Sequence, residues 1–224
     1  MGKTLTLTAS DGHKLSAYRA DPSGKPKGAL VVIQEIFGVN AHMREVCDGF
    51  AADGYVAIAP ALFDRVQPKV ELGYTPKDIE AGRELRGKIE WDAVLKDVEA
   101  AIKTVASAGK VGVVGYCWGG SVAWRAATRL KGVTAAVGYY GGQIAPFKDE
   151  TPRAAVMLHF GEKDASIPLS DVEAIKKAQP KLPIHVYAGA GHGFSCDHRG
   201  SFHSEAHKQA RTRTMEFFDK HLAA

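Results

Sequence analysis

One cysteine lies at the centre of a segment whose residue types suit nucleophilic chemistry. Residues 111–120 read VGVVGYCWGG, an apolar run followed by a glycine-rich turn. This pattern has the form of a nucleophile elbow, G-x-S-x-G, with Cys117 in the place of the serine. The glycines permit a tight turn in which the nucleophile takes a strained backbone conformation. The segment therefore predicts a strand, a sharp turn and a helix whose N-terminus favours a thiolate at Cys117.

An acid and a histidine follow Cys117 in the order that such sites use, nucleophile then acid then histidine. Asp164 and His192 each come shortly after a segment predicted to be a buried strand. Open α/β sheets place their sites beyond the carboxyl ends of parallel strands, so we expect these three residues to meet there. Glu162 competes with Asp164 for the role of the acid, although it lies two residues nearer its strand.

Glu35 is a fourth candidate, because it directly follows a near-continuous apolar segment and should lie at the same sheet edge. The residues alone leave two interpretations open, a surface loop charge or a buried acid of the site. The backbone N–H groups of Ile36 and Trp118 are the natural oxyanion donors. Sites of this kind use the residue after the nucleophile and a loop after an early strand.

The elements that would position these residues alternate along the chain. Two short alternating segments flank Asp11-Gly12, a hairpin turn signal. From residue 29 onward, apolar strands alternate with amphipathic helices, which predicts an α/β fold with a mostly parallel, doubly wound sheet flanked by helices, in a single domain over 1–224. The later strands are predicted at 29–33, 55–59, 111–115, 135–139, 155–160 and 184–187, and the helices at 40–53, from 75 onward, and at 91–106, 120–130, 169–178 and 204–221.

Composition excludes several classes of protein. The formal charge of +4 is spread along 224 residues without a basic stripe, so nucleic acid is not an expected partner. We see no secretory signal and no apolar run that could span a bilayer, so no membrane association is expected. Three cysteines without paired spacing indicate a reducing compartment and predict a cytoplasmic protein.

With these residues assembled, the sequence resembles the dienelactone hydrolase family, the carboxymethylenebutenolidase-like members of the α/β-hydrolase superfamily. The resemblance implies an α/β-hydrolase fold with Cys117, Asp164 and His192 as the triad. It also implies that Glu35 hydrogen-bonds the cysteine at rest. The segments that carry the match are Gln34–Asn40, Gly115–Gly120, Val137–Gly141 and Gly191–Phe194.

The resemblance implies opening of an activated ester or enol-lactone, such as dienelactone giving a maleylacetate-type product, without a cofactor. Substrate would displace Glu35 from its resting contacts, and Glu35 would take the thiol proton. The thiolate of Cys117 would attack the carbonyl while paired with protonated His192, the enolate would leave, and water would hydrolyse the acyl-enzyme. A thiolate suits good leaving groups, so amide hydrolysis is not expected.

The same resemblance implies a small anionic substrate whose carboxylate is held by arginines, one on a mid-chain helix and one shortly after the histidine. Neither of these arginine positions aligns cleanly with this sequence. Cys196 stands at the second position, and an arginine follows three residues later. The candidate substrate-binding residues are Arg83, Arg86, Arg199, Phe37 and Tyr140.

Three other functions fit part of the pattern. A general carboxylesterase or thioesterase would prefer simple aryl esters to anionic lactones. A binding protein would have kept the fold without catalysis. A redox-sensing protein would form a sulfenic acid or a Cys117–Cys196 crosslink with no hydrolysis. The sequence leaves the oligomeric state open between a monomer and a weak homodimer.

Downstream histidines invite a metal hypothesis, because His203 and His207 are four residues apart and His198 precedes them. No acidic or cysteine ligand accompanies them in a known pattern, so an exposed helix face is predicted and no metal is expected. Cys47 falls inside a predicted helix and is expected in the core.

Overall fold

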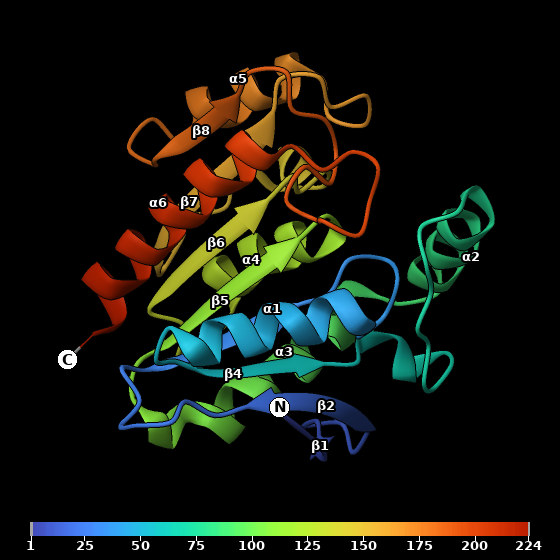
Figure 1. The fold of residues 1–224 in the computed structure, drawn as a ribbon, viewed down its shortest axis with the longest axis vertical. Helices are drawn as coiled ribbons and strands as arrows, with labels where there is room; N and C mark the ends of the chain where they lie inside the picture. The colour runs from blue at the N-terminus through green and yellow to red at the C-terminus, as the bar shows by residue number, and fades with distance from the viewer. Residues whose placement is uncertain (1, 224) are drawn as a thin grey trace.

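The apolar segments predicted as strands all join one eight-stranded sheet (Figure 1). The computed structural model describes residues 2–223. The sheet order is β1-β2-β4-β3-β5-β6-β7-β8. The strands β1 and β2 form an antiparallel hairpin, and β2 also pairs antiparallel with β4. Every other pair of neighbouring strands is parallel. The strands are β1 (Lys3–Thr8), β2 (Lys14–Ala20), β3 (Ala29–Ile33), β4 (Val56–Pro60), β5 (Val111–Tyr116), β6 (Ala135–Tyr139), β7 (Ala155–Gly161) and β8 (Ile184–Tyr187).

Helices cover both faces of this sheet, which confirms the doubly wound α/β prediction. In Figure 1, α1 and α6 lie on one face, whereas α3 and α4 lie on the other. Every residue of β3, β4, β5 and β6 is buried, as expected for parallel strands covered on both sides. The helices are α1 (Ala41–Ala52), α2 (Pro76–Gly87), α3 (Trp91–Val105), α4 (Trp118–Arg129), α5 (Leu169–Ala178) and α6 (Ser204–Leu222), with short 3₁₀ helices at Leu62–Arg65, Ala106–Ala108 and Ala145–Phe147.

Local sequence signals explain where the helices near the site begin. The side chain of Asn40 accepts a hydrogen bond from the N–H of Met43 and caps α1. A reciprocal capping box between Thr75 and Asp78, with Pro76 in the first turn, starts α2. This second helix lies beyond the carboxyl edge of the sheet, apart from the layers that cover its faces (Figure 1).

The core follows from this layering. Cys47 on α1 is fully buried, which confirms its predicted place in the core, and burial raises the pKa of its thiol well above the ordinary range. Across residues 2–223, no helix combines the length and apolar character needed to cross a lipid bilayer.

Candidate active site

Cys117 occupies the turn between β5 and α4 in a strained conformation, with φ of 57° and ψ of −122°. Glycine is required beside it, because a Cβ atom on Gly115 would lie 1.8 Å from the carbonyl oxygen of Gly119. A Cβ on Gly119 would lie 2.4 Å from the carbonyl oxygen of Ile33. The close packing of strand against helix makes α4 begin at Trp118, two residues earlier than predicted. The predicted elbow geometry is therefore present.

The structure brings the three residues of the predicted triad together. Nε2 of His192 lies 3.1 Å from Sγ of Cys117, and Nδ1 of His192 lies 2.8 Å from Oδ2 of Asp164. The other oxygen of Asp164 accepts hydrogen bonds from the backbone N–H groups of Ser166 at 2.8 Å and Ile167 at 3.1 Å. Asp164 is thus buried and held by its own loop, with one oxygen directed at the imidazole.

The competing acid lies elsewhere. Glu162 is exposed, and its carboxylate accepts a hydrogen bond from the N–H of Gly189 at 2.9 Å. Glu162 lies two positions before Asp164 in the chain, and of these two acids only Asp164 contacts the histidine. Glu162 instead joins the loops that follow β7 and β8.

Opposing effects set the protonation of His192. Burial lowers its pKa, but the charge of the Cys117 thiolate and the hydrogen bond that His192 donates to Asp164 outweigh burial and raise the pKa of His192 to about 10. The imidazolium form therefore predominates at neutral pH when it faces a thiolate. A histidine oriented by a carboxylate and placed beside a cysteine is the arrangement that covalent catalysis by cysteine requires.

Glu35 proves to be a buried acid rather than a surface charge, with 1% of its surface exposed. Its Oε1 accepts a hydrogen bond from Nη1 of Arg199 at 3.1 Å, while its Oε2 is buried without a partner among residues 2–223. Burial raises the pKa of Glu35, and the charges of Arg199 and His192 oppose that rise. The contact that the resemblance implied between Glu35 and the resting cysteine is absent from the described residues. In its place, Sγ of Cys117 faces His192.

Arg199 lies in the site, as expected of a substrate-binding candidate. Its guanidinium group lies 5.4 Å from the ring centre of Phe37 and 5.6 Å from that of Tyr74. The neighbouring Cys196 is fully buried, and burial raises the pKa of its thiol to about 12. This environment does not favour the Cys117–Cys196 crosslink of the redox-sensing alternative, because oxidation needs an accessible thiolate.

The two mid-chain arginines differ in their surroundings. Arg83 is exposed on α2, whereas Arg86 is half-buried and donates a hydrogen bond to the side chain of Gln143. The N–H of Gln143 in turn binds the hydroxyl of Ser121, four residues after the nucleophile, at 2.9 Å. Arg86 therefore connects α2 to the elbow, and Arg83 does not take part in that connection.

Both predicted oxyanion donors flank the site. Trp118 is the first residue of α4, so its N–H has no intrahelical acceptor. Ile36 lies in the loop after β3, and α2 packs closely on it, since a Cβ on Gly82 would lie 2.0 Å from the carbonyl oxygen of Ile36. The fully buried Gln34 fixes this loop by accepting from the N–H of Leu62 at 3.0 Å and donating to the carbonyl of Glu35 at 3.1 Å.

Tyr140 lines the same space from the loop after β6. Its backbone has a φ of 38°, its ring centre lies 5.2 Å from that of His192, and its buried hydroxyl has no partner among residues 2–223.

Sequence reasoning missed the supporting roles of Gln34 and Tyr74. The sequence offered a hint for Gln34, which lies in the family-matching segment Gln34–Asn40. It offered none for Tyr74, because only folding brings that residue beside Phe37.

An eight-stranded, mostly parallel sheet with a nucleophile elbow after β5, and with an acid and a histidine beyond β7 and β8, defines an α/β-hydrolase. The sequence model of the dienelactone hydrolase family matches residues 15–222. The chain belongs to the dienelactone hydrolase family and is a carboxylic ester hydrolase acting on small ester or lactone substrates.

Individual relatives agree with this assignment. A carboxymethylenebutenolidase of Pseudomonas putida is 35% identical over 226 residues, covering 95% of this chain and 94% of the relative. A Synechocystis protein provisionally named a carboxymethylenebutenolidase is 37% identical and covers 98% of this chain and 97% of its own. A Klebsiella pneumoniae crystal structure provisionally described as a dienelactone hydrolase matches with a TM-score of 0.86 and 31% identity, over 99% of this chain and 100% of that one.

Proposed function

We propose that this hydrolase opens an activated ester or enol-lactone through a thioester formed on Cys117. The observation that carries the proposal is the continuous hydrogen-bonded chain from Sγ of Cys117 to His192 at 3.1 Å and from His192 to Asp164 at 2.8 Å. A nucleophile next to a base that is itself oriented by a third group is the arrangement needed for covalent catalysis.

In the proposed reaction, the thiolate of Cys117 attacks the carbonyl carbon, and the carbonyl oxygen becomes an oxyanion. The N–H groups of Trp118 and Ile36 stabilise that oxyanion. The C–O bond to the leaving enolate then breaks, and His192 can supply the proton that the leaving group takes up. Neutral His192 next removes a proton from water, which attacks the thioester and releases Cys117.

Glu35 has a separate role in this proposal. At rest it is paired with Arg199, and a substrate carboxylate that reached Arg199 would compete for the same guanidinium group. Glu35 released from this pair would be a buried carboxylate with a raised pKa, and therefore a better proton acceptor for a thiol. Binding of an anionic substrate would thus be linked to activation of Cys117.

An anionic substrate, such as a dienelactone, is proposed on two grounds. Arg199 and Arg86 are both partly shielded from water near the elbow, where a cation interacts strongly with a carboxylate. The relatives named as carboxymethylenebutenolidases act, by that name, on a butenolide that bears a carboxylate-containing arm. Three free cysteines further suit a reducing compartment such as the cytoplasm.

The test is the initial rate of dienelactone ring opening by the wild type, by Cys117→Ala and by the control Cys47→Ala. We expect loss of at least about a thousandfold in Cys117→Ala and near-normal turnover in Cys47→Ala, whose residue lies in the core. Cys117-dependent cleavage of aryl esters without dienelactone turnover would contradict the substrate and keep the nucleophile. Turnover that survives in folded Cys117→Ala would contradict the mechanism itself.

A further inference from the structure

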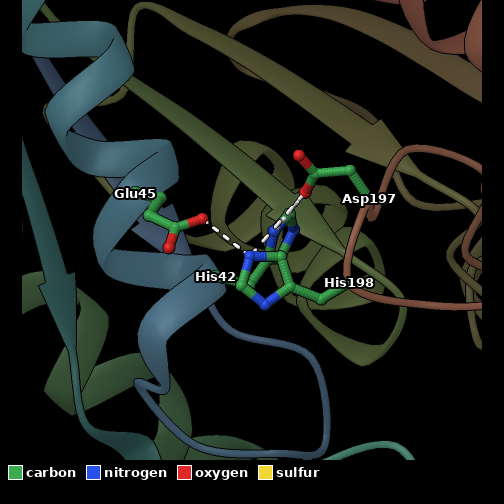
Figure 2. A group of neighbouring side chains, drawn as sticks. All are labelled: His42, Glu45, Asp197 and His198. Carbon is green, nitrogen blue, oxygen red and sulfur yellow. Dashed lines mark hydrogen bonds and ion pairs between the residues drawn. The ribbon is translucent and has the colours of Figure 1, made fainter.

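A second group of chemically active side chains lies between α1 and the loop that follows β8 (Figure 2). His42 and Glu45 are three residues apart on α1 and share one face of that helix. Asp197 and His198 come from the loop between β8 and α6 and meet them there. None of the four takes part in the proposed hydrolysis.

The spacing of these side chains suits a tetrahedral metal ion. One ligand atom from each residue lies within 4.8 Å of all the others. Nδ1 of His42 lies 3.3 Å from Oδ1 of Asp197, and Nε2 of His198 lies 2.7 Å from Oε2 of Glu45 and 4.0 Å from Oδ1 of Asp197. Ligands about 2.0–2.2 Å from a tetrahedral zinc ion are roughly 3.3–3.6 Å apart, which falls in the middle of these separations.

The donor set also selects the kind of ion. Two imidazoles with two carboxylates favour zinc and similar transition metals, whereas calcium and magnesium prefer oxygen ligands alone. His42 is buried, and its Nδ1 faces the carboxylate of Asp197, so a ring nitrogen is directed into the group. The two carboxylates supply negative charge, which a divalent cation offsets.

An ion can reach this group from solvent. A cavity of about 180 Å³ opens beside it and is lined by His42, Glu45 and Asp197. Arg211 lines the same cavity, but its guanidinium group is paired with Asp53 and lies over the ring of Phe50. The positive charge of Arg211 is thus partly offset by its own partner.

A second, overlapping set of ligand atoms is less suited to a cation. Glu35, His42 and Cys196 also lie within 4.8 Å of one another. Glu35 already pairs with Arg199, which repels a cation, and burial holds the thiol of Cys196 in its protonated form. The four-residue group has neither obstacle.

We propose that His42, Glu45, Asp197 and His198 bind one divalent transition-metal ion of the zinc type. The ion would tie α1 to the loop that carries Arg199, and would stabilise that side of the active site. This departs from the sequence-based expectation of no metal, which considered His198 with His203 and His207. Those two have other partners: the ring of His203 caps α6, and the ring of His207 contacts the hydroxyl of Ser195.

The experiment is calorimetric titration of metal-stripped protein with zinc chloride, carried out in a Cys117→Ala background so that the catalytic thiolate cannot bind the metal. Variants are His198→Ala and Asp197→Asn, both at exposed positions that should not affect folding. The control is His221→Ala, which removes a histidine in the last turn of α6. His42 is left intact because it is buried.

We expect one zinc ion per chain with a dissociation constant below about 10 μM, weakened at least about tenfold in His198→Ala and Asp197→Asn and unchanged in His221→Ala. At a hundredfold excess over that constant, zinc should raise the melting temperature by about 5 °C or more. Absence of saturable binding, or equal binding by His198→Ala, would overturn the proposal. The absorption spectrum of the cobalt-loaded protein gives a further check. A thiolate charge-transfer band would assign the metal to Cys196 and would also overturn the proposal. Because binding is read in an inactive background, the outcome is independent of the proposed hydrolysis.

Discussion

Nη1 of Arg199 lies 3.1 Å from Oε1 of Glu35, and this ion pair is almost entirely withdrawn from water. The partners are 164 residues apart in the chain. Removing one partner of a buried pair is strongly destabilising, because the other charge is then buried without compensation. The relationship therefore makes a clear prediction about single and double substitutions.

Arg199→Ala should reduce the free energy of unfolding by about 3 kcal/mol, because it leaves Glu35 buried without its partner. The double variant Arg199→Ala/Glu35→Gln should recover much of this loss. Removal of Arg199 also raises the pKa of Glu35 further, so folded protein takes up a proton more readily than unfolded protein. The loss in Arg199→Ala should accordingly be smaller at pH 5 than at pH 8. Denaturant titrations at both pH values measure these effects, and strict additivity of the two substitutions would contradict the coupling.

Asp164→Asn should shift the alkaline limb of the pH–rate profile to lower pH. Burial lowers the pKa of His192, but the Cys117 thiolate and Asp164 together raise it to about 10, so imidazolium persists until that pH in the wild type. Without the carboxylate, the proton is lost earlier, by roughly 1–2 pH units, and kcat falls by roughly 10²–10⁴-fold. Steady-state rates between pH 6 and 11 measure the limb. Glu162→Gln, at the exposed competing acid, should leave the profile unchanged; if it moves the limb instead, the acid has been misassigned.

Arg86→Ala should raise KM for an anionic lactone about tenfold while changing KM for a neutral aryl ester little, because a half-buried guanidinium group near the elbow would be lost. Arg83→Ala on the exposed side of the same helix is the matched control and should change neither value. Arg199→Ala is a less specific probe, since it also leaves Glu35 without its partner. Equal effects of Arg86→Ala on both substrates would remove Arg86 from carboxylate recognition.

Gly115→Ala should reduce the free energy of unfolding by at least about 3 kcal/mol and abolish activity, because the new Cβ would lie 1.8 Å from the carbonyl oxygen of Gly119. Gly49→Ala, in the interior of α1 where no described atom outside the local helix backbone lies within 4 Å of the added Cβ, should stabilise the protein by about 0.5–1 kcal/mol. Thermal and denaturant unfolding of both variants compare the two glycines. A well-folded, active Gly115→Ala protein would show that the elbow tolerates a side chain.

Tyr140→Phe should stabilise the substrate-free protein by about 1 kcal/mol, because it removes a buried hydroxyl that has no partner among residues 2–223. Tyr139→Phe is its counterpart: that hydroxyl lies 2.7 Å from Oγ1 of Thr214, and its loss should destabilise by about 1 kcal/mol. Unfolding curves recorded side by side give the two signs. If both variants lose stability, the Tyr140 hydroxyl has a partner after all, such as an ordered water.

Much of this protein could be predicted from residue order alone, because the signals concerned are local. Apolar runs of strand length and the glycines around Cys117 each act within a few residues, and both took their predicted form. The family motifs extended this local information to the triad. Asp164 and His192 met Cys117 because parallel strands carry their carboxyl ends to one edge of the sheet.

Only the tertiary structure decided which charges face each other. The residue order left Glu35 open as a surface acid, and the fold buries it beside Arg199. The residue order also did not distinguish Arg83 from Arg86, and the orientation of α2 does. The fold likewise places His198 beside His42. Such pairings join residues far apart in the chain, and their energies depend on burial and distance, neither of which leaves a periodic signal in the sequence.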